Sequence, residues 1–241
     1  MPRTDNPTVV LVHGAFADAS GFARVIPALI ARGLDVVAPA VPHRGLLGDS
    51  AYVASIVREV DGPVVLVGHS YGGAVITVAG VEDNVRALVF VAGYALDEGE
   101  SVGELQGGFP DSDLATALVR TPFPDGDSVA AGADLSVGID RFPSVLAADV
   151  DPRVAAVLAV SQRPLAARAC AEQAPAAAWR TKASWGLVAT ADRAVDPEAQ
   201  RYGYRRAGMA VAEVDSSHLV MLAHPERVVE LIEEAVRATV R

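Results

Sequence analysis

One stretch decides the fold of this chain: Val64-Val65-Leu66-Val67-Gly68-His69-Ser70-Tyr71-Gly72-Gly73. Its apolar start has no alternation and predicts a strand buried on both faces, and the residues that follow, 74–78, have helical character. Between them stands G-x-S-x-G, the pattern of a sharp turn that raises a serine above the carboxyl edge of a sheet. Residues two before and two after Ser70 meet in such a turn, which only Gly68 and Gly72 allow. Ser70 is the predicted nucleophile, and an ordinary glycine-rich turn is the alternative.

Around this stretch, short apolar runs alternate with longer segments of helical periodicity. This order predicts an α/β fold, in which helices on both faces cover a mostly parallel, six-stranded sheet. The expected strands are residues 8–13, 35–40, 63–68, 85–92, 185–189 and 210–214, and the expected helices are residues 22–32, 50–60, 73–80, 197–207 and 225–239.

The alternation stops between Asp97 and Ala183, where glycine and proline are frequent and no clear strand is visible. An alanine-rich piece from about residue 150 to 170 has helical character. We interpret residues 97–183 as a helical cap inserted over the sheet, and residues 1–96 together with 184–241 as the core of a single domain. The composition of the cap also suits a mobile lid.

Composition narrows the class of protein. The 241 residues are 51% hydrophobic, which is enough to fill a sizeable core. A formal net charge of −10 argues against binding to nucleic acid, which needs a basic face. Cys170 is the one cysteine, which excludes an intrachain disulfide and a cysteine-based zinc cluster.

The same composition gives expectations about location and partners. No apolar run approaches the roughly 18 residues of a membrane span, and the short apolar run near the N-terminus does not suit a signal peptide. We therefore expect a cytoplasmic protein that uses no cofactor and no metal, exists as a monomer or homodimer, and has a small molecule as its partner.

A serine hydroxyl becomes a nucleophile only when a base takes its proton and an acid orients that base. Among the five histidines, His218 follows the last predicted strand, where the chain order serine, acid, histidine places the base. His218 and His224 are not spaced as a helix-borne metal pair. We expect His13 to be structural, His69 to point away from Ser70, and His43 and His224 to have surface or capping roles.

Three aspartates compete for the role of the orienting acid. Asp192 stands just beyond the strand expected at 185–189, from where a carboxylate reaches a histidine on the neighbouring loop. Asp97 is the second candidate. Asp196 directly precedes a proline at a helix start, which is typical of an N-cap.

The negative oxygen of a tetrahedral intermediate needs two fixed donors. One is expected to be the amide of Tyr71, next to the nucleophile. The other is expected in the turn after the first strand, His13-Gly14-Ala15-Phe16, with the Ala15 amide preferred and Phe16 as the fallback. Gly14 permits a close approach of the backbone.

Four segments, residues 10–16, 62–73, 184–197 and 216–225, together resemble the α/β-hydrolase superfamily. They are similar to the small carboxylesterases that include bacterial pyrethroid-type ester hydrolases, and to plant methylesterases and hydroxynitrile lyases. The resemblance implies Ser70, Asp192 and His218 as a catalytic triad, the Ala15 and Tyr71 amides as an oxyanion hole, and an apolar pocket under a helical cap. Hydroxynitrile lyases have a lysine where this chain has Leu219 and a threonine in place of Gly14, which argues against cyanohydrin cleavage.

These observations predict a carboxylesterase-type serine hydrolase that cleaves esters of small, largely apolar molecules through an acyl-enzyme. The alternatives are the same triad used for acyl transfer, carbon–carbon hydrolysis or a lyase or cyclase step, and a ligand-binding protein with an idle triad. Pocket candidates are Phe16, Leu219, Trp179 and Trp185.

Overall fold

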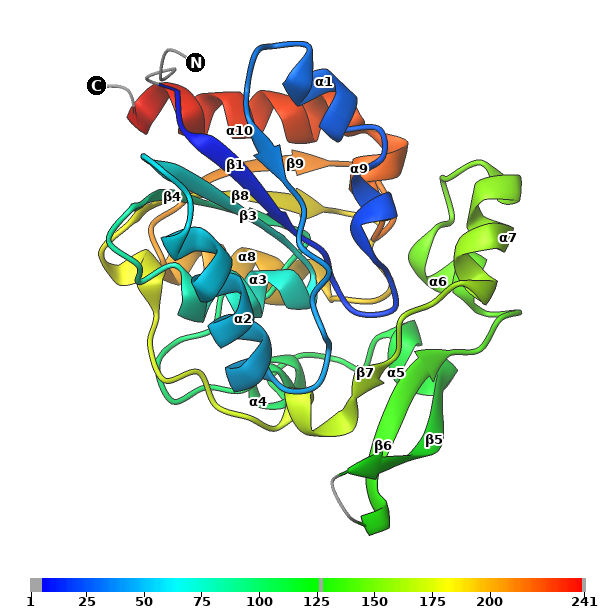
Figure 1. Cartoon of the computed structure of the whole chain (residues 1–241). Coiled ribbons are helices and arrows are strands. Elements are labelled where there is room, and N and C mark those ends of the chain that lie inside the picture. Colours follow the sequence, from blue (N-terminus) through cyan, green and yellow to red (C-terminus); the bar gives the residue numbers. More distant parts are fainter. Residues whose placement is uncertain (1–5, 126–127, 240–241) are drawn as a thin grey trace.

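The structure is a computed structural model, and it describes residues 6–125 and 128–239. A parallel sheet of six strands in the order β2-β1-β3-β4-β8-β9 forms its centre (Figure 1). The predicted sheet is therefore confirmed. Its strands are β1 (Thr8–Val12), β2 (Val36–Val37), β3 (Val64–His69), β4 (Val85–Val91), β8 (Ala183–Ala189) and β9 (Ala210–Val214).

The middle of this sheet is fully enclosed, as the unbroken apolar runs predict. Every residue of β3 is buried, and β1 and β4 flank it in parallel. The register pairs Val12 with Gly68 and His69 with Val91, so the carboxyl ends of these three strands meet at one edge. In parallel α/β sheets that edge is where ligands bind.

Helices cover both faces of the sheet. In Figure 1, α1 and α10 lie on one face, and α2, α3 and α8 lie on the other. The last helix has the predicted bounds, and its apolar stripe is buried. These helices are α1 (Ile26–Ile30), α2 (Leu46–Arg58), α3 (Tyr71–Ala79), α8 (Pro197–Arg206) and α10 (Pro225–Thr239), with the short α9 (Val220–Ala223) before α10.

The first predicted helix, at residues 22–32, is shorter than expected. A 3-10 turn, Ala19–Phe22, comes first, and α1 begins only at Ile26. Pro27 explains the difference, because proline has no amide hydrogen and fits a helix only in its first turn.

Residues 97–183, called the inserted segment below, lie between β4 and β8, which are neighbours in the sheet. The expectation that this segment has no strand is wrong, because β5, β6 and β7 form a three-stranded antiparallel sheet. Figure 1 shows β5, β6, α6 and α7 standing to one side of the central sheet. The elements are α4 (Val102–Gly107), α5 (Asp113–Ala117), β5 (Leu118–Asp125), β6 (Ser128–Val137), α6 (Phe142–Leu146), α7 (Pro152–Val160) and β7 (Leu165–Ala166).

Two prolines, Pro122 and Pro124, hide β5 in the sequence. Proline cannot donate to a strand ladder, so it normally argues against a strand and is tolerated at an edge. β5 is the edge strand of its sheet, paired with β6 alone. Its partner β6 is rich in alanine and glycine, which have low strand propensity.

Among the described residues, no helix has the length and apolar character needed to cross a bilayer. The same residues contain no cluster of three or more His, Cys, Asp or Glu side chains with the arrangement of a metal site.

Candidate active site

Ser70 stands at the sharp turn between β3 and α3 that the sequence predicts. Its φ is +54°, a left-handed conformation that non-glycine residues rarely adopt, and it is 7% exposed. A Cβ on Gly68 would lie 2.4 Å from the carbonyl oxygen of Gly72, and a Cβ on Gly72 would lie 2.3 Å from that of Val12. Both glycines are therefore required by the backbone contacts that hold the serine in place.

Hydrogen bonds from the next strand fix this strained residue. The Ser70 amide donates to the carbonyl of Val91 at 3.1 Å, and its own carbonyl accepts from Tyr94 at 3.2 Å and from Gly73 at 2.9 Å. A strained conformation that the surrounding structure imposes in this way is typical of functional sites.

His218 and Asp192 form a buried pair at the same edge of the sheet. Nδ1 of His218 and Oδ2 of Asp192 are 2.7 Å apart, and the two side chains are 4% and 0% exposed. Asp192 follows the end of β8, and His218 follows the end of β9. With Nδ1–H donating to the carboxylate, Nε2 of His218 is the nitrogen left to accept a proton.

Four hydrogen bonds hold the Asp192 carboxylate. Besides His218, it accepts from the amides of Ala194 at 2.7 Å and Val195 at 3.0 Å, and from Nε2 of Gln200 at 2.8 Å. The sequence analysis missed Gln200, which is 1% exposed. Helical periodicity places Gln200 on the buried face of α8, and a polar glutamine at a buried position is the sequence signal that could have identified it.

His69 brings His218 beside the serine turn. Nε2 of His69 lies 2.9 Å from the carbonyl oxygen of His218, and the two rings have their centroids 4.6 Å apart. Ser70 Oγ makes no hydrogen bond with the His218 ring in the described part of the chain. Catalytic hydrogen bonds of ligand-free enzymes are often loose and tighten with substrate.

The turn after β1 lies directly against the serine. A Cβ on Gly14 would be 2.7 Å from the Cβ of Ser70. The Phe16 amide donates to the carbonyl of Arg163 at 3.1 Å, which occupies that donor. The amides of Ala15 and Tyr71 donate to no protein acceptor within residues 6–125 and 128–239, which is compatible with the oxyanion-hole role predicted for them.

The inserted segment contributes to this site through Asp149, a residue that the sequence analysis missed. Its carboxylate accepts from the hydroxyl of Ser216 at 2.7 Å, from the amide of Ser217 at 3.0 Å and from the Ser217 hydroxyl. The carbonyl of Leu146 accepts from the Leu219 amide at 2.9 Å. The residues on both sides of His218 are thus held by the inserted segment.

The charge of Asp149 suits this role. Burial raises the pKa of its carboxyl, but hydrogen bonds from Ser217 and Ser216 outweigh burial, so the pKa lies below its ordinary value. The carboxylate is therefore ionised at neutral pH. No motif marks Asp149, because it lies in the loop between α6 and α7 and meets its partners only in the folded chain.

Replacing Asp149 with alanine should lower kcat by about 10- to 100-fold, because small displacements of a catalytic group have effects of that size. Asp149→Asn keeps one acceptor oxygen and should lose less. The measurements are kcat on an ester substrate and the melting temperature of each variant. Unchanged kcat in the folded alanine variant would exclude a positioning role for Asp149.

Two of the other histidines, His13 and His43, give one confirmed and one wrong expectation. His13 is structural: its Nε2 accepts from the Val41 amide at 3.0 Å. His43 was expected to have a surface or capping role but is completely buried, with its ring 4.8 Å from that of His13 and 5.7 Å from that of Tyr71. The inserted segment causes this, because the Ala166 amide donates to the His43 carbonyl at 2.9 Å and β7 thereby covers the loop.

Burial of His43 should make the protein less stable in acid. Burial, followed by the charges of His13 and Arg163, lowers the pKa of His43 to about 3, against an ordinary value of 6.5. Between those values the unfolded chain binds a proton that the folded chain does not, so the free energy of unfolding falls as the pH falls. From pH 7 to pH 5 the loss from this residue is about 2 kcal/mol.

The test compares urea unfolding of the wild type and His43→Asn at pH 7 and pH 5. Asparagine tolerates the φ of +60° at this position and does not titrate. The wild type should lose about 2 kcal/mol more than the variant on acidification, because all other titrating groups are shared. Equal losses would contradict the prediction.

Of the four residues predicted to line a substrate pocket, two lie beside the serine turn and two lie away from it. Phe16 and Leu219 are buried in the two loops that flank it, next to Ala15 and His218. Trp179 lies in the 3-10 turn Ala178–Arg180, which packs against Gly80 at the far end of α3, and its Nε1 donates to the Leu96 carbonyl at 2.6 Å. Trp185 lies in the first half of β8, away from the carboxyl edge. The structure does not bring these two tryptophans to Ser70.

The competing acids also have other partners. Asp97 pairs with Arg180, at 2.9 and 2.7 Å, so it does not orient His218. Asp196 caps α8 as expected, accepting from the Glu198 amide at 2.7 Å. His224 is partly exposed, 3.8 Å from a carboxylate oxygen of Asp149.

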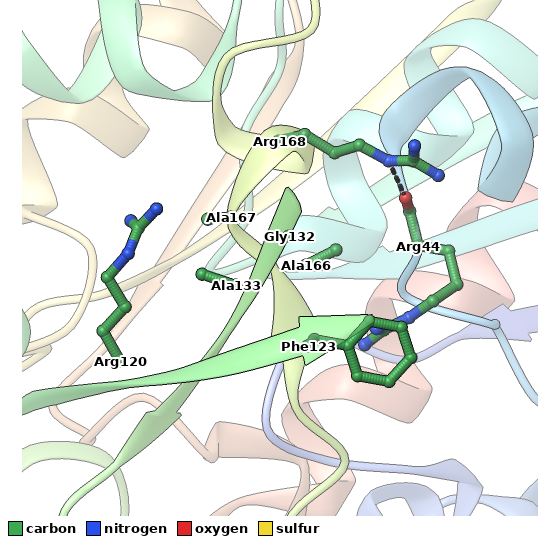
Figure 2. Close-up of a pocket in the computed structure, with 8 residues that line it drawn as sticks. All are labelled: Arg44, Arg120, Phe123, Gly132, Ala133, Ala166, Ala167 and Arg168. Carbon is green, nitrogen blue, oxygen red and sulfur yellow. Dashed lines mark hydrogen bonds between the residues drawn. The ribbon is translucent and has the colours of Figure 1, made fainter. Parts of the chain in front are cut away.

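A cavity of about 350 Å³ beside the β5–β6 hairpin is separate from these loops (Figure 2). Figure 2 shows Arg44, Arg120 and Arg168 around it. Arg44 is paired with Asp134 at 2.7 Å, and its Cζ lies 4.5 Å from the centre of the Phe123 ring. This cavity includes none of the residues that surround Ser70.

The chain matches the model of the alpha/beta hydrolase family over residues 9–231, and it belongs to this family. A curated relative, the carbendazim hydrolyzing esterase of Nocardioides sp. (strain SG-4G), is 34% identical over 111 residues. That match spans 39% of this chain and 44% of the relative, so less than half the length of either.

Solved structures share the fold over nearly the whole chain. A pyrethroid hydrolase from Sphingobium faniae JZ-2 has a TM-score of 0.78 at 20% identity, covering 96% of this chain and 98% of that one. Polyneuridine aldehyde esterase has a TM-score of 0.82 at 19% identity, covering 95% and 99%. The methylesterase MES16 from Arabidopsis has a TM-score of 0.80 at 16% identity, covering 96% and 99%. The resemblance to the α/β-hydrolase superfamily and its fold is thereby confirmed.

Proposed function

We propose that this chain is a serine carboxylesterase that cleaves esters of small, largely apolar molecules through an acyl-enzyme. One observation carries the proposal: the buried contact of 2.7 Å between Nδ1 of His218 and Oδ2 of Asp192, placed beside the strained Ser70. A buried histidine–carboxylate pair next to a serine on this turn has the arrangement of a nucleophile with its base. Relatives and fold neighbours that are named esterases or hydrolases support the same reaction class.

In the proposed mechanism, Nε2 of His218 takes the proton of the Ser70 hydroxyl while its oxygen attacks the ester carbonyl. Asp192 holds Nδ1 protonated and stabilises the imidazolium that forms. The carbonyl oxygen becomes negative and accepts from the amides of Ala15 and Tyr71, each donor contributing about 3 to 4 kcal/mol. His218 then protonates the leaving alcohol.

Water completes the proposed cycle. His218 takes a proton from a water molecule, which attacks the acyl-enzyme and releases the carboxylic acid, and Ser70 recovers its proton. The positive end of α3, which begins at Tyr71, faces the developing charge and favours the same intermediate. Apart from the ester and the water molecule, every group in this proposed cycle belongs to the chain itself.

The test is a panel of p-nitrophenyl esters together with a fluorophosphonate that labels activated serines. We expect ester hydrolysis and one covalent label, located at Ser70 by peptide mass spectrometry. An alcohol acceptor added to the assay separates hydrolysis from acyl transfer. Tight ligand binding without turnover or label would instead identify a binding protein and overturn the proposal.

A further inference from the structure

A buried carboxylate outside the proposed triad is bonded to the residue that follows the nucleophile. Asp49 lies in the first turn of α2 and is completely buried. Burial of a carboxylate is costly unless hydrogen bonds replace the lost water. Oδ2 of Asp49 accepts from the hydroxyl of Tyr71 at 2.8 Å, and Oδ1 accepts from the amide of Arg44 at 3.1 Å. Asp49 thereby ties the loop before α2 to the first residue of α3.

Tyr71 contributes to this arrangement through both its backbone and its side chain. Its amide is one of the two proposed oxyanion donors, while its side chain is 2% exposed and reaches Asp49 on α2. Burial, followed by the charge of Asp49, raises the pKa of Tyr71, so the hydroxyl keeps its proton and donates. Because α3 begins at Tyr71, this hydrogen bond fixes the first turn of α3 against α2.

The ring of Tyr71 also connects to the turn of the other proposed donor. It meets the ring of His43 edge-on, with the ring centres 5.7 Å apart, and His43 meets His13 in the same way at 4.8 Å. Both histidines are completely buried, and burial lowers the pKa of each, so both rings are neutral at pH 7. We call Asp49, Tyr71, His43 and His13 the positioning row.

The far end of the positioning row holds the peptide group of the Ala15 donor. Nε2 of His13 accepts from the Val41 amide at 3.0 Å, so Nδ1 carries the proton and donates to the carbonyl of Gly14 at 3.1 Å. The Gly14 carbonyl and the Ala15 N–H belong to one planar peptide group. The bond from His13 therefore restrains the direction of the Ala15 N–H.

Resting on the proposed esterase function, we propose that Asp49 is a positioning residue of the oxyanion hole. It holds the Tyr71 donor directly, and it supports the Ala15 donor through the rings of Tyr71, His43 and His13. The two donors act most strongly when the carbonyl oxygen becomes negative in the transition state. Loss of the Asp49 contact should therefore lower kcat and leave KM almost unchanged.

Two substitutions break the contact from opposite sides. Tyr71→Phe removes only the hydroxyl, and Asp49→Ala removes its acceptor. Each should lower kcat by about 10-fold, because a displaced donor loses part of the effect of a deleted one, and each should keep KM within about 2-fold. The double variant should lose no more than the worse single variant, because both changes remove the same bond. Asp49→Asn keeps an oxygen that accepts from Tyr71 and should lose less.

A trifluoromethyl ketone inhibitor reports the oxyanion hole separately from turnover. The Ser70 oxygen bonds to the ketone carbon, the carbonyl oxygen takes the negative charge, and His218 takes the serine proton. The inhibition constant should rise by about the same 10-fold in Tyr71→Phe and Asp49→Ala. All rates are divided by the number of serines that a fluorophosphonate labels, so unfolded protein does not count.

Ser50→Ala is the matched control. Ser50 is the next residue of α2, is 1% exposed, and donates its hydroxyl to the Val75 carbonyl of α3 at 3.4 Å. The variant thus loses another buried hydrogen bond between the same two helices, one turn further along α3 from Tyr71. It should keep the wild-type kcat and inhibition constant, whatever its melting temperature.

The outcomes separate the two proposals. Hydrolysis that depends on Ser70, with wild-type kcat and inhibition constants in Tyr71→Phe and Asp49→Ala, would overturn the inference and leave the esterase function intact. A loss that Ser50→Ala shares would also overturn it, because the cause would then be helix packing in general. If Asp49→Ala does not fold, Tyr71→Phe decides by the same criteria. A wild type with neither hydrolysis nor label would overturn the esterase function, and the inference with it.

Discussion

The Ser70→Ala variant should lose ester hydrolysis almost completely, with kcat lower by on the order of 10⁴- to 10⁶-fold. The hydroxyl is the one group that forms the covalent bond in the proposed cycle, so no neighbour replaces it. The change is small at this position: alanine removes one oxygen from a side chain that is 7% exposed. We therefore expect the variant to fold, with the β3 to α3 turn intact.

The measurement is kcat on the best ester of the panel, with circular dichroism and the melting temperature as checks on folding. Ser55→Ala is a matched control, because Ser55 is an exposed serine of α2 whose hydroxyl bonds only within its own helix. The control should keep the wild-type rate. A folded Ser70→Ala protein that retained wild-type turnover would refute the assignment of the nucleophile.

Asp192→Asn should have the second largest effect and lower kcat by about 10⁴-fold, as the equivalent change does in a serine protease. The carboxylate accepts the Nδ1 proton of His218 at 2.7 Å, whereas an amide nitrogen there would favour the opposite tautomer, with Nε2 protonated. That tautomer cannot take the proton of Ser70. The same substitution also weakens the bonds from Ala194, Val195 and Gln200.

Asp97→Asn is the natural comparison, since Asp97 was the other candidate for the acid and is bonded to Arg180 instead. Its kcat should stay within about 3-fold of the wild type, because exposed ion pairs contribute little. Steady-state rates across pH 6 to 9 and the melting temperatures of both variants complete the test. Equal losses in the two variants would contradict the role given to Asp192.

The fold of the core could be predicted because its signals are local. β3 is an unbroken apolar run that ends in the glycines of the turn, and α10 carries a complete apolar stripe after Pro225. The β5–β6 hairpin could not be predicted, since prolines and alanines weaken its strand signal and only tertiary pairing reveals it. The start of α1 was predicted too early. Pro27 was a local signal for a later start, but the prediction followed the apolar periodicity instead.

The residues of the candidate site also divide into those with a local sequence signal and those that depend on contacts in the folded chain. Ser70, His218 and Asp192 could be proposed from their places after β3, β9 and β8, because the ends of parallel strands converge at one edge. Asp149 could not be proposed, since it acts by hydrogen bonds to residues 67 and 68 positions away in the chain. Gln200 was missed although its place on the buried face of α8 was a sequence signal. His43 was misplaced for a related reason: loop histidines are usually exposed, and here β7 buries one.

The inserted segment supplies the hydrogen-bond acceptors for Ser217 and Leu219, so the loop that carries His218 is anchored to residues 146–149. A displacement of residues 146–149 away from the sheet would also move the His218 ring away from Asp192. In the proposed mechanism, turnover would therefore require residues 146–149 to stay in place. We would then expect the proposed substrate to enter and leave without displacing the hydrogen bonds of Asp149 and Leu146 to the loop of His218.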